Sequence, residues 1–177
     1  MIRYPKVYRA KDGRAIVVRP STAEDINPLL EFFSRLPEDD RLHLRVDVTQ
    51  REVMRRRMLP RPHWEVVRLI GEFGDRVVAE SSIAHRTYGF ESHVGEVRVL
   101  VAPDFRGTGL ATYLGRQLFA HAMLMDLQKV QACMMADDEL AQRFAQRLGF
   151  EPEGVLNSFV KDVQGNNHDL MVMSLST

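Results

Sequence analysis

The chain has 177 residues, of which 45% are hydrophobic and 27% charged, and its formal net charge at pH 7 is zero. This composition is typical of one globular domain, and no apolar run approaches the roughly 20 residues that a membrane-spanning helix needs. The single cysteine, Cys133, cannot form an internal disulfide, and the N-terminus is too polar for a signal peptide. We therefore expect one cytoplasmic domain over residues 1–177, without a membrane partner.

The first predicted elements are a strand and a helix. Residues 15–19 (AIVVR) are rich in β-branched side chains, and the proline that follows ends the strand that they predict. Ser21 or Thr22 can then cap a helix that runs to about Leu36. We expect residues 1–13 to be a polar, irregular lead-in.

A second helix is predicted over residues 50–59, where Thr49 and Glu52 have the spacing of a capping box. Its arginine run, residues 55–57, has two interpretations: a solvated helix face or a contact with nucleic acid. No aromatic side chains alternate with these arginines, as they would in many RNA-binding surfaces. We therefore favour the solvated face and expect no nucleic-acid partner.

Three strand-like runs follow, over residues 64–73, 76–86 and 94–101. Gly74 and Asp75 separate the first two runs and predict a tight hairpin turn. The three runs therefore predict an antiparallel meander.

The next stretch joins an apolar strand to an amphipathic helix through the turn Arg106-Gly107-Thr108-Gly109. The two glycines allow a tight turn and a close approach to a ligand, and the unpaired N–H groups of the first helical turn point towards that ligand. The helix, expected over residues 110–127, has one apolar stripe consisting of Leu110, Leu114, Leu118, Ala122 and Met125. We therefore predict an anion cradle suited to phosphate.

The remaining elements are a strand, a helix and a hairpin. Residues 130–135 predict a strand, and Asp137 or Asp138 can cap a helix that ends at Gly149, where glycine suits a left-handed cap. The last two strands are expected over residues 154–160 and 168–174. The full order is then β-α-α-β-β-β-α-β-α-β-β.

Two motifs in this order resemble the GNAT family of N-acetyltransferases. Residues 106–111 (RGTGLA) match the family's Arg/Gln-x-x-Gly-x-Gly/Ala signature, and residues 138–150 (DELAQRFAQRLGF) resemble its Asn-x-x-Ala…Leu-Gly-Phe segment. The opening and closing segments are similar to bacterial protein-lysine acetyltransferase domains. The resemblance implies an α/β (α+β) fold with a mixed, mostly antiparallel sheet of about seven strands flanked by about four helices.

The resemblance also implies acetyl-CoA as co-substrate. Backbone N–H groups of residues 106–111 would hold the pyrophosphate, and the central strand would splay from residues 130–135 around the thioester. A backbone N–H near the end of the central strand would polarise the acetyl carbonyl, and Asp138 would take the place of the family's asparagine. The implied cofactor-binding residues are Leu100, Val101, Arg106, Gly107, Thr108, Gly109, Leu110, Ala111 and Asp138.

Catalysis needs a base, because an amine with a pKa of about 10.4 is only about one part in 2,500 neutral at pH 7. Glu96 lies close to the family's glutamate base, although a solvated strand-end carboxylate is an equally open interpretation. Glu80 and His85 are weaker candidates. The family's tyrosine acid has no counterpart, because Ala145 occupies that position, so the thiolate would be protonated by water or leave unassisted.

The residues and the resemblance predict an N-acetyltransferase that transfers acetyl directly to a primary amine in a ternary complex. The resemblance favours a protein lysine or N-terminal amine as acceptor. A small-molecule amine or amino acid is the first alternative, which a deep, closed acceptor pocket would favour, and a non-catalytic acetyl-CoA-binding regulatory module is the second. The six histidines show no metal-ligand spacing, so we expect no metal. The acceptor and the oligomeric state stay open.

Overall fold

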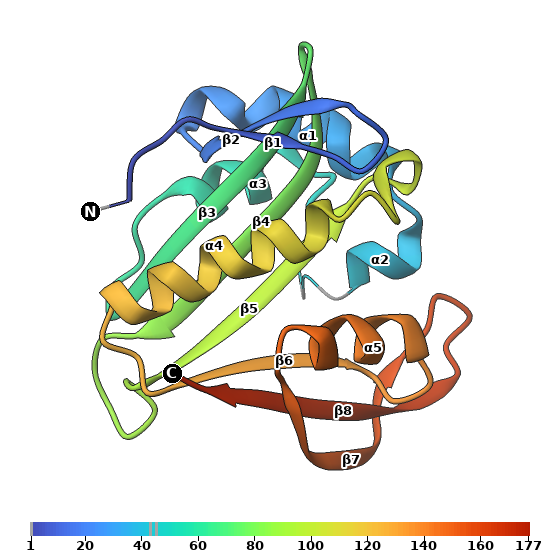
Figure 1. Cartoon of the computed structure of the whole chain (residues 1–177). Helices are drawn as coiled ribbons and strands as arrows, with labels where there is room; N and C mark the ends of the chain where they lie inside the picture. The colour runs from blue at the N-terminus through green and yellow to red at the C-terminus, as the bar shows by residue number, and fades with distance from the viewer. Residues whose placement is uncertain (1, 43, 45) are drawn as a thin grey trace.

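One sheet of eight strands forms the centre of the structure, a computed structural model that describes residues 2–42, 44 and 46–177 (Figure 1). The strands lie in the order β1-β2-β3-β4-β5-β6-β8-β7, and every neighbouring pair is antiparallel except β5 and β6. Their bounds are β1 Lys6–Arg9, β2 Ala15–Pro20, β3 Trp64–Phe73, β4 Arg76–Arg86, β5 Val94–Val101, β6 Lys129–Met135, β7 Glu151–Lys161 and β8 Asn167–Ser176.

Helices cover both faces of this sheet. Helix α4 crosses one face, whereas α1 and α3 pack on the other, and α5 packs beside β6 (Figure 1). The helices are α1 Ile26–Arg35, α2 Glu38–Leu42, α3 Arg51–Met58, α4 Leu110–Leu124 and α5 Glu139–Arg147, with 3-10 turns η1 Ala23–Asp25 and η2 Pro103–Phe105. None of the helices in the described ranges is both long and apolar enough to cross a membrane.

The hydrophobic core has two parts, one on each face of the sheet. The larger part lies under α4, where four members of the predicted stripe are buried: Leu110, Leu114, Leu118 and Ala122. The fifth, Met125, follows the last residue of the helix and is partly buried against the same core. The smaller part joins α1 and α3 to the opposite face through residues such as Phe33, Met54 and Ile70. Burial of these apolar side chains on both faces fixes which strand residues point to which helices.

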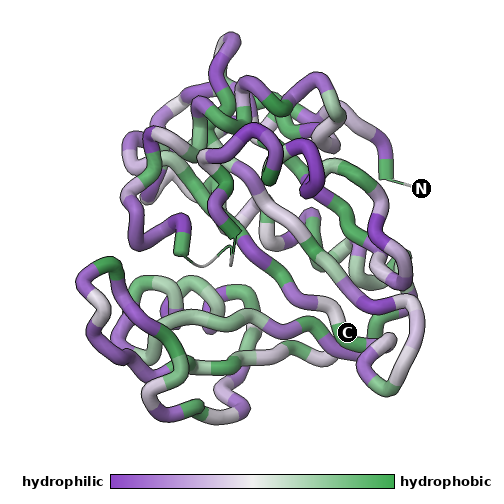
Figure 2. Tube along the Cα trace, turned by 180° about the vertical axis from the view of Figure 1, so that it is seen from behind, coloured by the Kyte–Doolittle hydropathy of each residue, from purple (hydrophilic) through white to green (hydrophobic). Residues whose placement is uncertain are grey.

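The two parallel strands β5 and β6 pair over a short distance only. Their register joins Val94 to Lys129, Gly95 to Val130 and Glu96 to Gln131, and no further pair is formed. Beyond this point β6 stays paired with β8, so the arm formed by β6, β7, β8 and α5 diverges from the rest of the sheet (Figures 1 and 2). The predicted splay between the central strand and residues 130–135 is therefore present.

The predicted element order lacks one strand and one helix. Strand β1 lies in the segment predicted to be irregular, where Lys6 pairs with Val18 and Tyr8 with Ile16. It is an edge strand in which intermediate and exposed residues alternate, so none of its residues is fully buried. Helix α2 has five residues and no buried side chain, which leaves no apolar pattern to find in the sequence.

The two predicted helix starts differ in outcome. At the first, Thr22 is the N-cap of the 3-10 turn η1, where its N–H donates to Asp25 Oδ2 at 2.7 Å, and Asp25 is the N-cap of α1 itself. At the second, the expected capping box is wrong, because Gln50 is the N-cap of α3 and the Thr49 hydroxyl donates to Asp47 Oδ1 at 2.5 Å. The Thr49 hydroxyl is thus hydrogen-bonded to Asp47 and does not form the capping box.

Candidate active site

The glycine-bearing loop between β5 and α4 has the backbone that the sequence predicts. Gly107 and Gly109 have φ values of +75° and +88°, a region that side-chain-bearing residues rarely adopt. A Cβ at Gly109 would lie 2.5 Å from Tyr8 Oη, so a side chain at this position would displace the Tyr8 hydroxyl. Gly109 is also the N-cap residue of α4, which places the loop at the positive end of the helix dipole.

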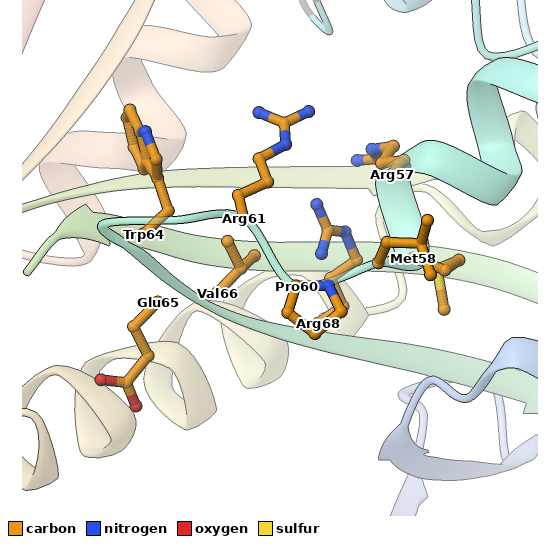
Figure 3. A pocket seen from close by; sticks show the side chains of 9 residues that line it. Arg57, Met58, Pro60, Arg61, Trp64, Glu65, Val66 and Arg68 are labelled. Atoms are coloured by element: carbon orange, nitrogen blue, oxygen red, sulfur yellow. The ribbon is translucent and has the colours of Figure 1, made fainter.

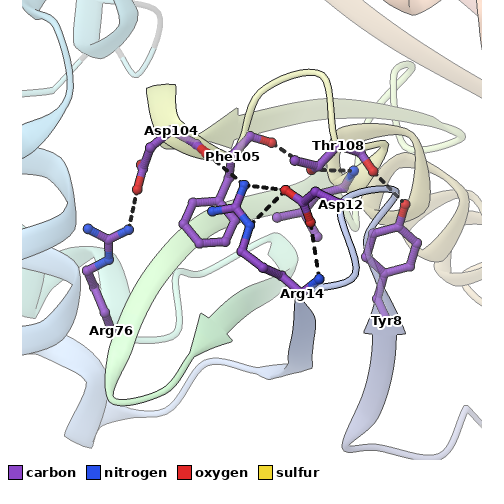
Figure 4. A network of polar contacts seen from close by, with 8 residues as sticks. Tyr8, Asp12, Arg14, Arg76, Asp104, Phe105 and Thr108 are labelled. Carbon is purple, nitrogen blue, oxygen red and sulfur yellow. Dashed lines mark hydrogen bonds and ion pairs between the residues drawn. The ribbon is translucent and has the colours of Figure 1, made fainter.

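Contacts with the N-terminal strands hold this loop in place (Figure 4). The Thr108 hydroxyl donates to the Phe105 C=O at 2.7 Å, and the Thr108 C=O accepts from Tyr8 Oη and from the Lys11 N–H, both at 3.1 Å. The Arg14 guanidinium lies over the Phe105 ring at 3.7 Å. The loop is therefore fixed before any ligand binds, which lowers the entropic cost of binding.

Several backbone donors of the loop are left for a ligand. The N–H groups of Gly107, Thr108 and Gly109 donate to no acceptor in the described ranges 2–42, 44 and 46–177. Arg106 adds a positive charge beside them: its guanidinium forms an ion pair with Asp40 of α2, and its Nε donates to the Val101 C=O at 3.3 Å. Free N–H groups at a helix N-terminus next to an arginine form a site suited to phosphate.

The open edge of β5 presents backbone groups to the space between β5 and β6. The Ala102 N–H donates to the Val78 C=O of β4 at 2.9 Å, and the direction of the backbone groups alternates along an antiparallel strand. The N–H of Leu100 therefore faces β4, whereas those of Val99 and Val101 face the opening. Of the two predicted positions, only Val101 offers its N–H on the open side.

Glu96 lies where β5 and β6 separate, at the last pair that they form. Its Oε1 accepts a hydrogen bond from Arg98 Nη2 at 2.7 Å, and both side chains are largely buried. Leu100 packs into the core under α1 and α3, so Glu96 and Arg98, at alternate positions before it, point to that same face. Glu96 thus lies at the closed end of the opening between β5 and β6.

The two weaker base candidates lie in different surroundings. Glu80 is completely buried on the face of Glu96, where its Oε1 accepts from Arg57 Nη2 at 2.9 Å. His85 is buried on the opposite face, where its Nδ1 lies 3.1 Å from the Ser92 carbonyl oxygen. The sheet itself therefore separates His85 from Glu96.

Helix α5 begins at a capping aspartate. At the position of the family's tyrosine acid it has an alanine. Asp138 is the N-cap, and its Oδ1 accepts from the Ala141 N–H at 2.9 Å. Ala145 is buried against the core. Because it caps the helix, the carboxylate of Asp138 already has a structural role, whereas Ala145 has no group that could act as an acid.

The sequence analysis missed a cluster of arginines on the face of Glu96. Arg57, Arg61 and Arg68 line a partly enclosed cavity of about 260 Å³ beside β3, and all three point to the same side of that strand (Figure 3). Arg55 and Arg56 are exposed as expected, but Arg57 is buried. Its position three residues after the buried Met54 is the helical spacing that signals a shared inward face.

A model of the Acetyltransferase (GNAT) family matches residues 29–150, which is more than half of the chain. The chain belongs to this family. The expectation of a GNAT acetyltransferase with acetyl-CoA as co-substrate is therefore confirmed. No curated protein matches the chain.

Solved structures share the GNAT fold at low sequence identity. The GNAT domain of S. lividans PAT is 16% identical with a TM-score of 0.77, over 98% of this chain and 97% of that one. Ribosomal-protein-alanine N-acetyltransferase from Brucella melitensis is 22% identical with a TM-score of 0.70, over 90% and 99%. YncA from Salmonella typhimurium, solved with its cofactor acetyl-CoA, is 19% identical with a TM-score of 0.71, over 91% and 93%.

These likenesses confirm the predicted fold class, a mixed and mostly antiparallel sheet flanked by helices. The element counts differ slightly from the expectation: the described part of the chain has eight strands and five α-helices, where about seven strands and about four helices were expected. The roles of Glu96, of Asp138 and of the loop residues stay predictions, to which the geometry above gives a physical basis.

Proposed function

We propose that this GNAT enzyme transfers the acetyl group of acetyl-CoA to a primary amine by direct attack within a ternary complex. The observation that carries the proposal is the open edge of β5, which runs from Glu96 at its closed end to the glycine-bearing loop at its open end. Residues 97–101 of this edge span roughly 16 Å at about 3.3 Å per residue. A long, thin molecule with a pyrophosphate at one end suits such a site.

The residues that would hold acetyl-CoA follow from this arrangement. The N–H groups of Gly107, Thr108 and Gly109 would bind the pyrophosphate, together with that of Ala111 in the first turn of α4. The Leu110 N–H would add a weaker contact, because it already donates to Thr108 Oγ1 at 3.4 Å. Arg106 would release Asp40 and bind a phosphate oxygen instead, since a guanidinium pairs with either anion.

The backbone edge would orient the rest of the molecule. The N–H groups of Val99 and Val101 would pair with the amide groups of the pantetheine arm or polarise the acetyl carbonyl. Leu100 would contribute through its place in the strand, because its own N–H faces β4. Asp138 would contribute by fixing the start of α5 next to the divergent β6.

Glu96 is the proposed base. Acetyl-CoA, when bound, supplies a thioester whose carbonyl carbon is electrophilic. The Glu96 carboxylate takes one proton from the acceptor's ammonium group, directly or through water, and so frees the nitrogen lone pair. The nitrogen then bonds to the acetyl carbon while the carbon–sulfur bond breaks. The second proton of the amine passes through water to the thiolate, which leaves an N-acetyl amide, a free thiol and a proton on Glu96.

Arg98 would position Glu96 for this step, because its 2.7 Å hydrogen bond fixes the carboxylate on the face where α1 and α3 pack. Water would protonate the sulfur, since the buried methyl group of Ala145 offers no acid. The thiolate needs little help to leave, because a thiol is a stronger acid than the amine and its anion is the weaker base.

The acceptor is a protein amine or a small molecule. The likeness to protein-lysine acetyltransferase domains favours a lysine or N-terminal amine, and one solved neighbour is named a ribosomal-protein-alanine N-acetyltransferase. The partly enclosed cavity on the face of Glu96 favours a small amine, because its volume of about 260 Å³ is close to the lower end of the range for small-molecule pockets.

Turnover tests the proposal. Release of free thiol from acetyl-CoA is measured with lysine peptides, N-terminal peptides, amino acids and polyamines, each against a blank without amine. We expect one class to raise thiol release well above the blank and mass spectrometry to find the N-acetyl product. Thiol release at the blank rate with every amine would contradict direct amine acetylation.

A further inference from the structure

The cavity beside β3 has an unusual charge balance. Four guanidinium groups gather around it: Arg57, Arg61 and Arg68 line the cavity, and the positive charge of Arg98 acts on Arg68 from β5. Two carboxylates on this face oppose them. Glu80 is completely buried and paired with Arg57, and Glu96 forms an ion pair with Arg98. Glu65 also lines the cavity, but its side chain points to the other side of β3 (Figure 3).

Some of these buried groups lack partners. Arg57 has a side-chain exposure of 6%, and its Nη1 has no hydrogen-bond partner among the described residues. The same holds for Arg68 Nε and for Glu80 Oε2. A buried donor without a partner is costly, and a buried guanidinium more so. Glu80 Oε1 accepts a hydrogen bond from Arg57 and lies 3.9 Å from Arg68 Nε as an ion pair, so Arg57 Nη1 and Arg68 Nε remain open as hydrogen-bond donors.

Burial and the neighbouring positive charges both disfavour the charged form of Arg68. Desolvation lowers the pKa of Arg68 to about 10, and the charges of Arg57, Arg61 and Arg98 add to this effect while Glu80 opposes it. The group remains charged at neutral pH, because even this pKa lies well above 7. An anion in the cavity would relieve the repulsion and supply the missing acceptors.

The sheet register connects this cavity to Glu96. Arg68 of β3 pairs with Ser82 of β4, which pairs with Arg98 of β5, so these three residues form one row on one face. Glu96 is in the next row, on the same face. The strands β3 and β5 are two strand spacings, or roughly 10 Å, apart. A long arginine side chain on β3 can reach across several ångström of this gap. An acceptor could therefore reach both sites if several bonds separate its two ends.

We propose that the acceptor is a small amine that carries an anionic group, a carboxylate or a phosphate, and that the cavity of Arg57, Arg61 and Arg68 binds this group while the amine faces Glu96. The inference rests on the proposed function and names its substrate class. Planar guanidinium groups form paired hydrogen bonds with carboxylate and phosphate oxygens, so this donor set recognises both.

Binding is tested first, without turnover. Trp64 is the only tryptophan of the chain and lines the cavity, so its fluorescence reports occupancy. The probes are glutarate and inorganic phosphate, with neutral glutaramide as the reference. We expect a saturable change with at least one anion, none with glutaramide, and binding weakened roughly ten- to a hundred-fold in Arg68→Gln and Arg61→Gln. Arg61 is exposed, so its replacement does not endanger folding.

The control variant is Arg55→Gln, which removes an equal charge from the exposed side of α3. It should bind the anion as the unmodified protein does. Equal responses to glutaramide and the anions, or unchanged anion binding in both Arg61→Gln and Arg68→Gln, would overturn the proposal whether or not any amine is acetylated.

Turnover then tests the substrate class with matched pairs of acceptors. 6-Aminohexanoate is compared with 6-aminohexanamide, and 3-aminopropyl phosphate with 3-aminopropanol, at saturating acetyl-CoA. We expect kcat/KM for one charged acceptor to exceed that of its neutral partner roughly ten- to a hundred-fold, a preference lost in Arg68→Gln. Equal use of charged and neutral amines, or acetylation of peptides alone, would refute the anionic small acceptor and leave amine acetylation standing.

Discussion

Glu96 and Arg98 lie two residues apart on one face of β5 and share a hydrogen-bonded ion pair of 2.7 Å where β5 and β6 separate. This pair fixes a carboxylate at the closed end of the opening. Because the remaining edge of β5 leads directly to the glycine-bearing loop, proton transfer and cofactor binding are joined by one continuous strand.

Replacing Glu96 by glutamine should separate catalysis from binding. Glutamine keeps the shape of the side chain but cannot accept the amine's proton, so kcat should fall by about 10²- to 10⁴-fold. Binding of acetyl-CoA, measured by calorimetry, should stay within about two-fold, because no phosphate contact is lost. The difference in kcat between Glu96→Gln and the unmodified protein should shrink as the pH approaches the pKa of the amine, about 10.4, because the neutral amine is then already present in solution.

The matched control is Glu139→Gln, an exposed carboxylate at the start of α5. It should keep the unmodified kcat. An unchanged kcat in Glu96→Gln would show that Glu96 is not the base. A kcat that depends on pH in the same way in both proteins would show the same.

Replacing Thr108 by valine should loosen the loop. Valine has nearly the same shape, but it leaves the Phe105 C=O without the hydroxyl that donates to it at 2.7 Å in a buried position. We expect the free energy of unfolding, measured in urea, to fall by about 1–3 kcal/mol. Thr87→Val, at an exposed position, should change it by less than about 0.5 kcal/mol. Equal effects of the two substitutions would show that the loop does not depend on this hydroxyl.

His168 should make stability depend on pH. It lies between two carboxylates, with Nε2 at 3.1 Å from Asp162 Oδ2 and Nδ1 at 2.7 Å from Asp137 Oδ2. The hydrogen bonds to Asp162 and then Asp137 raise the pKa of His168 above its usual 6.5. A raised pKa stabilises the folded state fully below the unfolded pKa, and this contribution is lost as the pH rises through the folded value.

His168→Gln should therefore lower the free energy of unfolding most at about pH 6 and least at about pH 9. Urea unfolding across this range measures the difference between the two proteins. A difference that stays constant with pH, or grows towards pH 9, would contradict the ion-paired state of His168.

The sequence predicted best where local pattern decides the structure. The bounds of β3, β4 and β5 agree with the predicted runs, because alternating apolar residues and the turn at Gly74 act over short distances. The positive φ values at Gly107 and Gly109, and the cap by Asp138, also follow from local chemistry. These features include the part of the site that depends on backbone geometry.

Long-range contacts explain what the sequence did not reveal. Arg57 looks like its exposed neighbours in the run 55–57, and its helical spacing from Met54 was the one local signal of its burial. The contact that pairs its charge, with Glu80, is distant in the sequence. Strand β1 is an edge strand whose pairing with β2 compensates for its weak apolar pattern. The direction of the Leu100 N–H likewise depends on its register with β4.

Calorimetric titration of acetyl-CoA into the unmodified protein and into Gly109→Glu tests the central claim most directly. A side chain at Gly109 would collide with Tyr8, and its charge would repel the pyrophosphate. Gly165→Glu is the control, since it has the same φ of +88° in an open hairpin turn. We predict binding by the unmodified protein and by Gly165→Glu, and binding weakened about a hundred-fold or more in folded Gly109→Glu. No binding by the unmodified protein, or equal affinity in Gly109→Glu, would contradict the site.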